Sequence, residues 1–363
     1  MRIMRKIRCC CGVLAVLVWG ACSASDDLPN DEYIGDTAPP DTHVVDTTTA
    51  PRDTADTADT APPATESDGP ATPTDTGTPT DDGTPTDIPG TDDTSAPIQK
   101  VFFDDFSYSS VAEPAFAAQG WYVRTGDGGP GVADCRWESE QVRFLSEPAD
   151  EAVQLMRLVA TTDGTGAGSV QAEVYTSRQF FYGTYAARVR FSDQPAEGSV
   201  AGDGLVQAFF TITPWSMANS PEYSEVDFEY LPSGGWGRAT STLWQTTWAQ
   251  AEPVSNTHDA QEQSHAGWRV LVFVVTDGEV RYFVDGVQVA SHGVPYAPVS
   301  IMGLHFNHWF IDGMLKPESG TRSWYQDVDW VYHVADVALT PDAVLQRVTA
   351  MRAFGLERWN SMP

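Results

Sequence analysis

Residues 223–231 read YSEVDFEYL, and acids occupy every second position of this stretch at Glu225, Asp227 and Glu229. Apolar and aromatic residues stand between them. Because successive side chains of a β-strand point to opposite faces, the alternation predicts a strand with one acidic face and one apolar face. Three like charges on one short face repel each other, which is unfavourable for folding. The acidic face therefore indicates a functional role.

Similar alternating runs recur on both sides of this stretch, from about residue 100 to residue 334, with Gly, Pro, Asp and Asn between them. Asp277-Gly278 and Asp285-Gly286 each separate two such runs, which is typical of tight β-hairpins. Many strands without a long helical period favour two packed antiparallel sheets, so we predict an all-β sandwich or jelly roll. The expected strands lie at residues 100–106, 152–160, 169–177, 183–191, 205–213, 224–231, 268–277, 279–291, 300–310 and 325–334.

The end of the chain has a different pattern. Thr340 can cap a helix, and Pro341 suits the first helical position. Apolar residues then recur at helical spacing, so we expect one appended helix within an extension over residues 338–363. Its apolar face, which would pack on the sandwich, consists of Val344, Leu345, Val348, Met351 and Leu356.

The start of the chain has the composition of an export signal, which we place at residues 1–22. A basic stretch precedes an apolar stretch, residues 9–21, that is too short to span a membrane as a mature helix. Cys22 follows a Gly-Ala pair, which resembles the lipobox of bacterial lipoproteins, in which the cysteine becomes the lipidated first residue. Trp19 departs from that pattern, which prefers an aliphatic residue there. Plain secretion with cleavage after Ala24, or an uncleaved anchor, are the alternatives.

Residues 23–97 are a low-complexity segment dominated by Thr, Asp and Pro. Such a segment cannot bury enough apolar surface to offset its ordering entropy, so we expect a disordered spacer with an r.m.s. span of about 50 Å. It would act as a tether, or as a linker with no further role. We therefore expect an exported protein, either a lipoprotein at the bacterial cell surface or outer membrane, or a secreted one. The protein would contact the membrane only through its lipid anchor.

The charge of the chain limits its partners. The formal net charge is −29, and about −17 of it belongs to residues 101–363. A surface of this sign disfavours nucleic acid and other polyanions, so a neutral substrate fits better. Cys135 is the one cysteine beyond Cys22, so we expect no internal disulfide. The domain over residues 98–337 is large enough to bury a core alone, and we expect a monomer.

The spacing of the acids suggests a reaction. Glu225 and Glu229 are four residues apart, roughly 13 Å between Cα atoms, and side chains leaning inward can bring their carboxyl groups to about 5–6 Å. That separation is expected of a retaining glycosidase, in which one carboxylate attacks and the other donates a proton. Asp227 can orient one glutamate through a shared hydrogen bond, and neighbouring negative charge helps to keep the proton donor protonated.

Two alternatives to catalysis stay open for the acidic face on spacing alone. One is a calcium-binding edge, although calcium prefers oxygen ligands from a loop and these acids follow a strand pattern. The second is a merely solvated face, which would leave the flanking aromatic residues unexplained.

Tryptophan is plentiful, with twelve residues in the chain. Core packing is an ordinary role for any one of them. A groove lined with aromatic rings is also what a polysaccharide needs, because the C–H faces of a sugar stack on rings while its hydroxyls seek polar partners. We therefore expect substrate-binding roles for the tryptophans that lie near the acidic strand in sequence, which are Trp215, Trp236, Trp244 and Trp248.

The acidic stretch resembles the ExDxE motif of glycoside hydrolase family 16, the lichenase, laminarinase and xyloglucan-transglycosylase group. Further segments resemble that family in the same order over about residues 100–334. FFDDFSY resembles its first strand, TSRQFFYGTYAARVRFS and GLVQAFFTIT the strands before the motif, VRYFVDGVQVA a hairpin, MGLHFNHWF its mxxNxW strand, and YQDVDWVYHV its closing strand. The resemblance implies a concanavalin A-like jelly roll and a glycosidase that hydrolyses O-glycosyl bonds.

The resemblance also implies roles for single residues. Glu225 matches the nucleophile, Asp227 the assisting acid and Glu229 the acid/base. Asn307 and Trp309 match a groove strand near the cleavage point, so we expect them to bind substrate. The motif has no extra residue between its second and third acids, as in the unbulged branch of lichenases and xyloglucan-active enzymes.

Some positions depart from the family pattern. Val275 stands where a tryptophan is common, and Ser224 where many members have Trp, Gly or Asp, whereas His265 and Trp268 match. Asp329 matches a position that in some members helps to bind a structural calcium ion. No cofactor is implied for catalysis. The departures leave fold and chemistry intact and leave the substrate open.

We therefore expect an endo-acting β-glucan hydrolase or transglycosylase. The alternative is a surface lectin that keeps the groove without turnover, although binding alone needs no such arrangement of acids. A purely structural surface protein on a stalk would account for the spacer and not for the acids. Hydrolysis and transglycosylation share one glycosyl-enzyme intermediate and differ in the acceptor, so the sequence leaves both open.

Our first testable prediction is that Cys22 carries a lipid, because it follows a basic and apolar signal and a Gly-Ala pair. Metabolic labelling with a fatty acid should mark the wild-type protein and should not mark the Cys22→Ala variant. Equal labelling of the two proteins would contradict lipidation at this residue.

Overall fold

The structure, a computed structural model, describes residues 99–363. The exceptions inside that range are residues 178, 200–201, 252 and 318. The expected export signal, its lipidation site Cys22 and the spacer over residues 23–97 lie outside the described residues. Within the described part, no helix is long and apolar enough to cross a membrane.

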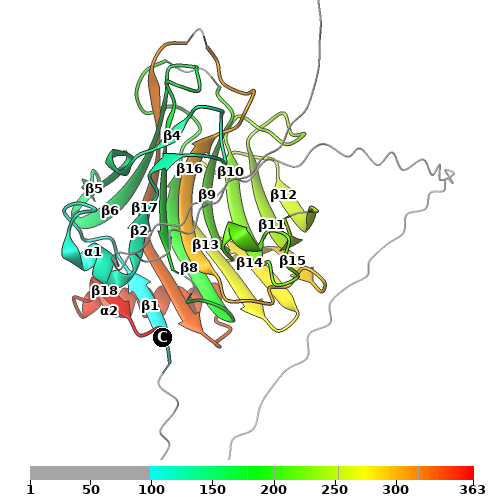
Figure 1. The fold of residues 1–363 in the computed structure, drawn as a ribbon. Helices are drawn as coiled ribbons and strands as arrows, with labels where there is room; N and C mark the ends of the chain where they lie inside the picture. Colours follow the sequence, from blue (N-terminus) through cyan, green and yellow to red (C-terminus); the bar gives the residue numbers. More distant parts are fainter. Residues whose placement is uncertain (1–98, 178, 200–201, 252, 318) are drawn as a thin grey trace, which may run out of the picture. The chain divides into compact units, whose positions relative to one another are not determined.

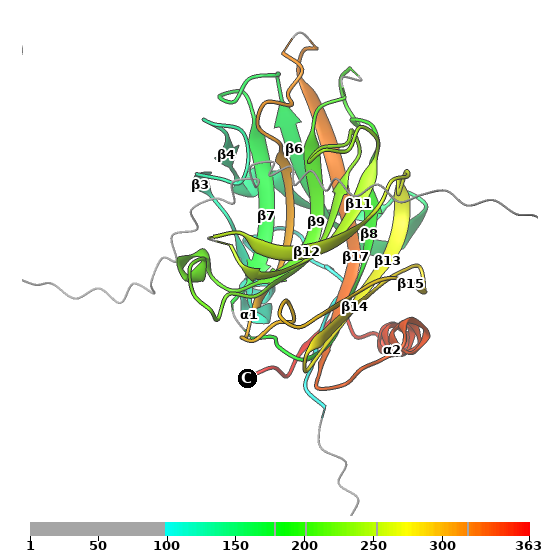
Figure 2. The same cartoon turned by 90° about the vertical axis from the view of Figure 1, so that its right-hand side faces the viewer.

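Two antiparallel sheets pack face to face, as Figures 1 and 2 show. The front sheet carries the acidic stretch on its strand β10, which pairs with β9 on one side and β11 on the other. Its edges are β2 and β12. In spatial order the strands of the front sheet are β2 (Trp121–Val123), β7 (Val170–Thr176), β16 (Gly303–Phe310), β9 (Leu205–Ile212), β10 (Glu225–Leu231), β11 (Thr242–Gln250) and β12 (Ser255–Gln261).

The back sheet is built around its longest strand, β17 (Arg322–Ala335), which pairs with β8, β6 and β1. A tight turn joins β13 to β14 and another joins β14 to β15. Beside β17, its strands are β5 (Val142–Glu147), β6 (Asp150–Thr162), β8 (Gly183–Phe191), β13 (Gly267–Thr276), β14 (Glu279–Val284), β15 (Val287–Gly293), β1 (Val101–Asp104) and β18 (Arg358–Asn360), with the short β3 (Gly126–Asp127) and β4 (Arg136–Trp137) at its margin.

The main core fills the space between the sheets. From the front sheet it takes Val226 and Phe228 of β10, and from the back sheet Tyr185, Leu271 and Phe273. All five side chains are fully buried. Because the apolar side chains of β10 are fixed in this core, the acids that alternate with them must project from the opposite, outer face of the front sheet.

The strand predictions are confirmed at each of the ten expected runs. The hairpins at Asp277-Gly278 and Asp285-Gly286 are also confirmed, because Thr276 pairs with Glu279 and Val284 with Val287. The prediction missed β5, β11 and β12, and also the short strands β2, β3, β4 and β18. The sequence of β11, TLWQTTWAQ, mixes Thr and Gln with its tryptophans, so it lacks the apolar alternation that marks the predicted strands.

The appended helix exists, and it is shorter than the expected extension. It is α2 (Pro341–Ala353), capped by the Thr340 hydroxyl, which accepts from the amide of Ala343 at 3.3 Å. The helix packs on the outer face of the back sheet through Val344 and Val348. Leu345, expected on the same face, is 38% exposed.

The residues after α2 do not continue the helix. Gly355, with a φ of +70°, follows its end, and the chain turns back as strand β18, which pairs with β1. This pairing uses backbone groups that β1 would otherwise leave open at its edge. A second, six-residue helix, α1 (Pro114–Gln119), was also not expected. It lies between β1 and β2, where the sequence shows no long helical period.

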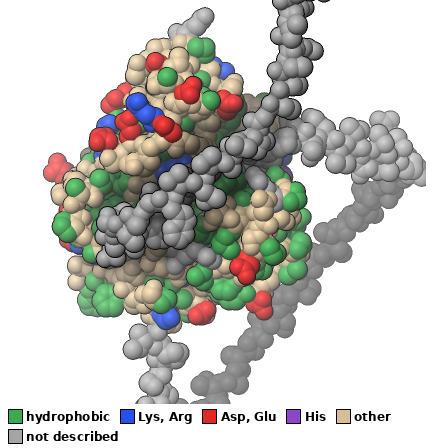
Figure 3. All heavy atoms as spheres, in the orientation of Figure 1, with side chains coloured by type: hydrophobic (Ala, Val, Ile, Leu, Met, Phe, Trp, Pro, Cys, Tyr) green, Lys and Arg blue, Asp and Glu red, His purple; other side chains and the backbone are tan. Residues whose placement is uncertain are grey.

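The surface seen in Figure 3 is mostly uncharged or apolar where the structure describes it. Acidic side chains are scattered over that face, and basic side chains gather near its upper left. The excess acidity of the domain is therefore not collected in one patch on this face.

Two buried histidines make the fold sensitive to acid. Burial lowers the pKa of His333 to about 3 and the pKa of His308 to about 3. In the unfolded chain a histidine has a pKa of about 6.5. The unfolded state therefore binds more protons below that pH, so the stability that the neutral histidines contribute is lost as the pH falls from about 6.5 toward 3.

We predict that His333→Phe weakens this acid dependence. The ring of His333 packs against Phe180 and Tyr185 at centroid distances of 5.1 and 4.2 Å, so phenylalanine retains most of the packing. The free energy of unfolding, measured from pH 7 to pH 4, should fall less steeply in the variant, by up to about 1.4 kcal/mol per pH unit. Equal slopes for the two proteins would contradict this prediction.

Candidate active site

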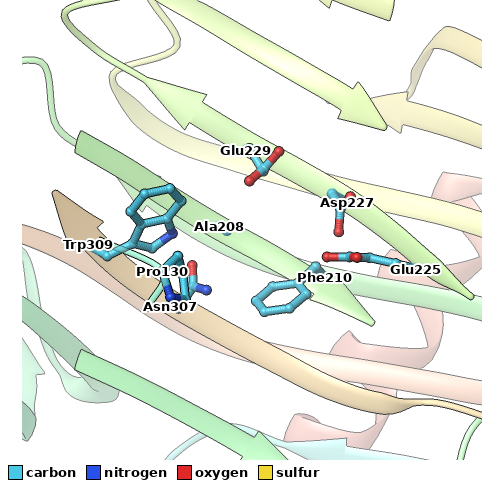
Figure 4. Close-up of a pocket in the computed structure, with 8 residues that line it drawn as sticks. All are labelled: Pro130, Ala208, Phe210, Glu225, Asp227, Glu229, Asn307 and Trp309. Carbon is cyan, nitrogen blue, oxygen red and sulfur yellow. The ribbon is translucent and has the colours of Figure 1, made fainter. Parts of the chain in front are cut away.

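The three acids project together from the outer face of β10, as Figure 4 shows. Glu225 is 6% exposed and Asp227 is 3% exposed, whereas Glu229 is partly exposed. The two-residue repeat of the strand therefore brings all three carboxyl groups into one site, with Glu229 the more accessible to solvent.

Neutral donors hold two of these carboxyl groups. The Tyr223 hydroxyl donates a hydrogen bond to Glu225. The indole Nε1 of Trp248 donates to Oδ2 of Asp227 at 2.9 Å. Trp248 lies directly opposite Glu225 on β11, and its indole reaches along the strand to the middle acid. These hydrogen bonds fix the orientation of the carboxyl groups before any substrate binds.

The neighbouring strands build the rest of the site. On β9, Phe210 is the cross-strand partner of Asp227, and Ala208 is the partner of Glu229. The small side chain of Ala208 leaves space beside the most accessible acid. One hollow is formed in front of these strands, and its lining residues are Glu225, Asp227, Glu229, Ala208, Phe210, Asn307, Trp309 and Pro130.

Asn307 and Trp309, which we expected to bind substrate, line the same hollow as the acids (Figure 4). They alternate on β16, where Asn307 pairs with Ala208 of β9. The loop before β4 brings Pro130 to the same wall. Residues that are distant in sequence thus meet because β9 places β16 and β10 on its two sides.

The expected tryptophans lie in one apolar cluster on the outer face of the front sheet. The ring of Trp236 contacts two other rings of this cluster. Its centroid lies 6.2 Å from that of Trp244 and 6.3 Å from that of Trp309. Trp215 meets Tyr223 edge-on at 6.4 Å. The cluster, to which Trp248 also belongs, thus surrounds the acids. That these rings bind sugar stays a prediction.

Sequence reasoning missed a buried polar chain beside the hollow. Nδ1 of His305 lies 2.8 Å from Oε1 of Glu173, and Arg124 donates to the second carboxylate oxygen at 3.1 Å. Burial by itself would raise the pKa of Glu173, but the hydrogen bond from His305 and the charge of Arg124 outweigh it and lower that pKa. Arg124 also lies over the ring of Trp137, 4.2 Å from its centroid.

Tyr223, Phe210, Ala208 and Pro130 were also missed. Their positions in the site follow from strand register and from a loop, and no chemical pattern in the sequence marks them. The position of Tyr223, two residues before Glu225, was the one available signal, because it shares the face of the acids.

The surroundings of Asp329 do not fit a calcium ion. This residue is buried in the back sheet, away from β10, and both of its carboxylate oxygens are engaged. Oδ2 accepts from Arg188 at 2.6 Å, and Oδ1 accepts from Arg352 of α2 at 2.6 Å. Two guanidinium groups would repel a divalent cation. In the part of the chain that the structure describes, no group of three or more His, Cys, Asp or Glu side chains is placed to hold a metal.

A sequence profile for "Glycosyl hydrolases family 16" matches residues 132–332, more than half of the chain. The chain belongs to glycosyl hydrolase family 16. It is therefore a glycosidase that hydrolyses O-glycosyl bonds, and the prediction of family and enzyme class is confirmed.

Individual members of the family can be aligned with this chain. It is 26% identical over 215 residues to the endo-1,3-1,4-beta-glycanase ExoK of Rhizobium meliloti, an alignment that covers 59% of this chain and 70% of that protein. The solved Bacillus licheniformis beta-glucanase is 16% identical with a TM-score of 0.46, over 64% of this chain and 97% of that one. A lichenase from a mouse hindgut metagenome is 19% identical with a TM-score of 0.47, over 64% and 98%.

Proposed function

We propose that this family 16 enzyme is an endo-acting glycosidase that cleaves a neutral β-glucan with retention of anomeric configuration. The observation that carries the proposal is the placement of Glu225, Asp227 and Glu229 on one strand face, in one hollow with Asn307 and Trp309. The lectin alternative would not need a proton donor and a nucleophile side by side.

In the first step, Glu225 attacks the anomeric carbon of the bound sugar. Its hydrogen bond from Tyr223 orients the carboxylate for that attack. Glu229 gives its proton to the glycosidic oxygen, the bond from that oxygen to the anomeric carbon breaks, and the leaving chain departs as an alcohol. The more exposed position of Glu229 suits a group that meets the leaving oxygen at the mouth of the site.

In the second step, Glu229 acts as a base. It takes a proton from a water molecule, or from a hydroxyl of an acceptor sugar, while the oxygen of that molecule attacks the anomeric carbon. The bond to Glu225 breaks and its carboxylate is restored. Two inversions give net retention, and the choice between water and sugar decides between hydrolysis and transglycosylation.

Asp227 lies between the two glutamates and acts through charge and orientation. The indole of Trp248 fixes one of its oxygens at 2.9 Å. A carboxylate held at this place disfavours a further negative charge beside it, so it favours the protonated form of Glu229 that the first step requires.

Several observations support a neutral β-glucan as the substrate. The domain is acidic, so it would repel sulfated or uronic polymers. An aromatic cluster surrounds the acids, as stacking on sugar faces requires. A relative is named as an endo-1,3-1,4-beta-glycanase, which favours mixed-linkage or β-1,4-linked glucan. We also propose that the enzyme works outside the cell, either lipid-anchored or secreted.

We predict that the protein cleaves mixed-linkage β-glucan or xyloglucan faster than carrageenan, because the acidic domain disfavours a sulfated chain. It should also cleave them faster than agar, because its acidic motif resembles that of the lichenase and xyloglucan-active branch. Incubation with this panel, followed by sizing of the products, should show a rapid fall in polymer length, as endo cleavage requires. Faster cleavage of a sulfated polymer would contradict the proposed substrate class, a neutral β-glucan. Binding without any product would favour the lectin alternative.

The mechanism leads to a further prediction. Glu225→Ala should lower kcat by several powers of ten, because the covalent step is lost. Glu229→Ala should spare the first step for substrates with good leaving groups, since these need no proton. Proton NMR of the first product, recorded before mutarotation, should show the β-anomer. If the α-anomer forms first, the reaction inverts and Glu225 is not the nucleophile.

A further inference from the structure

A row of four rings crosses the outer face of the front sheet and starts at the middle acid. Phe210 is the cross-strand partner of Asp227, His305 of Phe210, Tyr175 of His305, and Tyr122 of Tyr175. The ring centroids of successive members lie 4.9, 5.3 and 5.6 Å apart. The last two contacts are stacked, with interplanar angles of 16° and 25°. The four neighbouring strands β9, β16, β7 and β2 contribute one ring each.

The row ends at an exposed ring on the edge of the sheet. Trp121 points into the core, where its indole donates to Asp104 at 2.8 Å, so the next residue, Tyr122, points to the outer face that holds the acids. Strand β2 is the edge strand of the front sheet. The ring of Tyr122 is 46% exposed, and Tyr175 stacks on one of its faces. Its opposite face is therefore turned away from the row.

The middle of the row is held in place. His305 is fixed by Glu173, which is itself paired with Arg124, and these three side chains are at least nine-tenths buried. A Cβ atom at Gly303 would lie 3.0 Å from Nε2 of His305 and 2.6 Å from the carbonyl oxygen of Thr176. Glycine at this position therefore leaves the space that the imidazole uses.

The row spans a length that one or two sugars do not reach. From β10 to β2 there are four strand spacings, or about 19 Å. A glucan that crosses the front sheet from the acids toward β2 extends several sugar units before it reaches this edge. Its pyranose rings have apolar C–H faces that stack on aromatic rings and hydroxyls that seek polar partners.

We propose that Tyr122 forms a distal sugar-binding subsite, which stacks on a pyranose ring of the bound glucan several units away from the bond that is cleaved. The proposal rests on the proposed function and adds a selectivity to it. Long chains gain a contact that short chains lack, so the enzyme favours polymer over short oligosaccharides. The competing possibility is that Tyr122 only covers Tyr175, in which case its removal has no dependence on chain length.

The experiment compares full-length wild-type protein with Tyr122→Ala and Tyr122→Phe. Initial rates are measured on mixed-linkage gluco-oligosaccharides, a tetrasaccharide and an octasaccharide. Tyr122→Ala should lower kcat/KM about three- to tenfold on the octasaccharide and leave the tetrasaccharide unchanged, since one stacking contact is lost. Tyr122→Phe keeps the ring and should match wild type. Tyr182→Ala, which alters an aromatic residue beside the β13–β14 turn of the back sheet, is the control and should change neither rate.

A binding measurement separates this proposal from the proposed function. The Glu225→Ala protein and the Glu225→Ala, Tyr122→Ala protein are titrated with the same two oligosaccharides. The second substitution should weaken binding of the octasaccharide by a similar factor and leave the tetrasaccharide unaffected. If wild-type protein cleaves no glucan, the proposed function fails and the titration alone decides the subsite. Equal effects on both oligosaccharides, or no effect on either, would overturn the role of Tyr122.

Discussion

The site depends on the pairing of β10 between β9 and β11. One face of β10 is fixed by Val226 and Phe228 in the core between the sheets, so the strand has no freedom to turn its acids inward. A slip of one residue against β9 would place carboxyl groups in the core and apolar side chains in the groove. The free energy of core burial therefore enforces the register that brings Glu225 and Glu229 to the same hollow.

The same pairing supplies the groups that surround the acids. Cross-strand partners flank the acidic positions, with Ala208 and Phe210 of the hollow on one side and Trp244 and Trp248 of the aromatic cluster on the opposite side. The antiparallel register thus turns one linear motif into a groove. A change that preserved the motif and shifted β11 would separate Asp227 from the indole that holds it.

The acids of the active site and those of the back sheet are held in different ways. In the back sheet, Asp327 pairs with Arg157 and Asp329 pairs with Arg188 and Arg352. Such pairs occupy the lone pairs of the carboxylate with charged donors. At the active site, the hydroxyl of Tyr223 donates to Glu225 and the indole of Trp248 donates to Asp227, and both of these donors are neutral. Neutral donors orient a carboxyl group without cancelling the charge that the reaction uses.

The sequence by itself determined the strands with an alternating apolar pattern, two hairpins, the C-terminal helix and the acidic face of 225–229, because these follow from periods of two and 3.6 residues and from short-range turn chemistry. The sequence did not predict the polar strand β11 or the return of the chain as strand β18. The environment of Asp329 escaped it as well, since Arg188 and Arg352 come from another strand and from α2. Only the tertiary structure placed Tyr223, Phe210 and the ring row, because cross-strand partners are chosen by register and core packing between segments far apart in the chain.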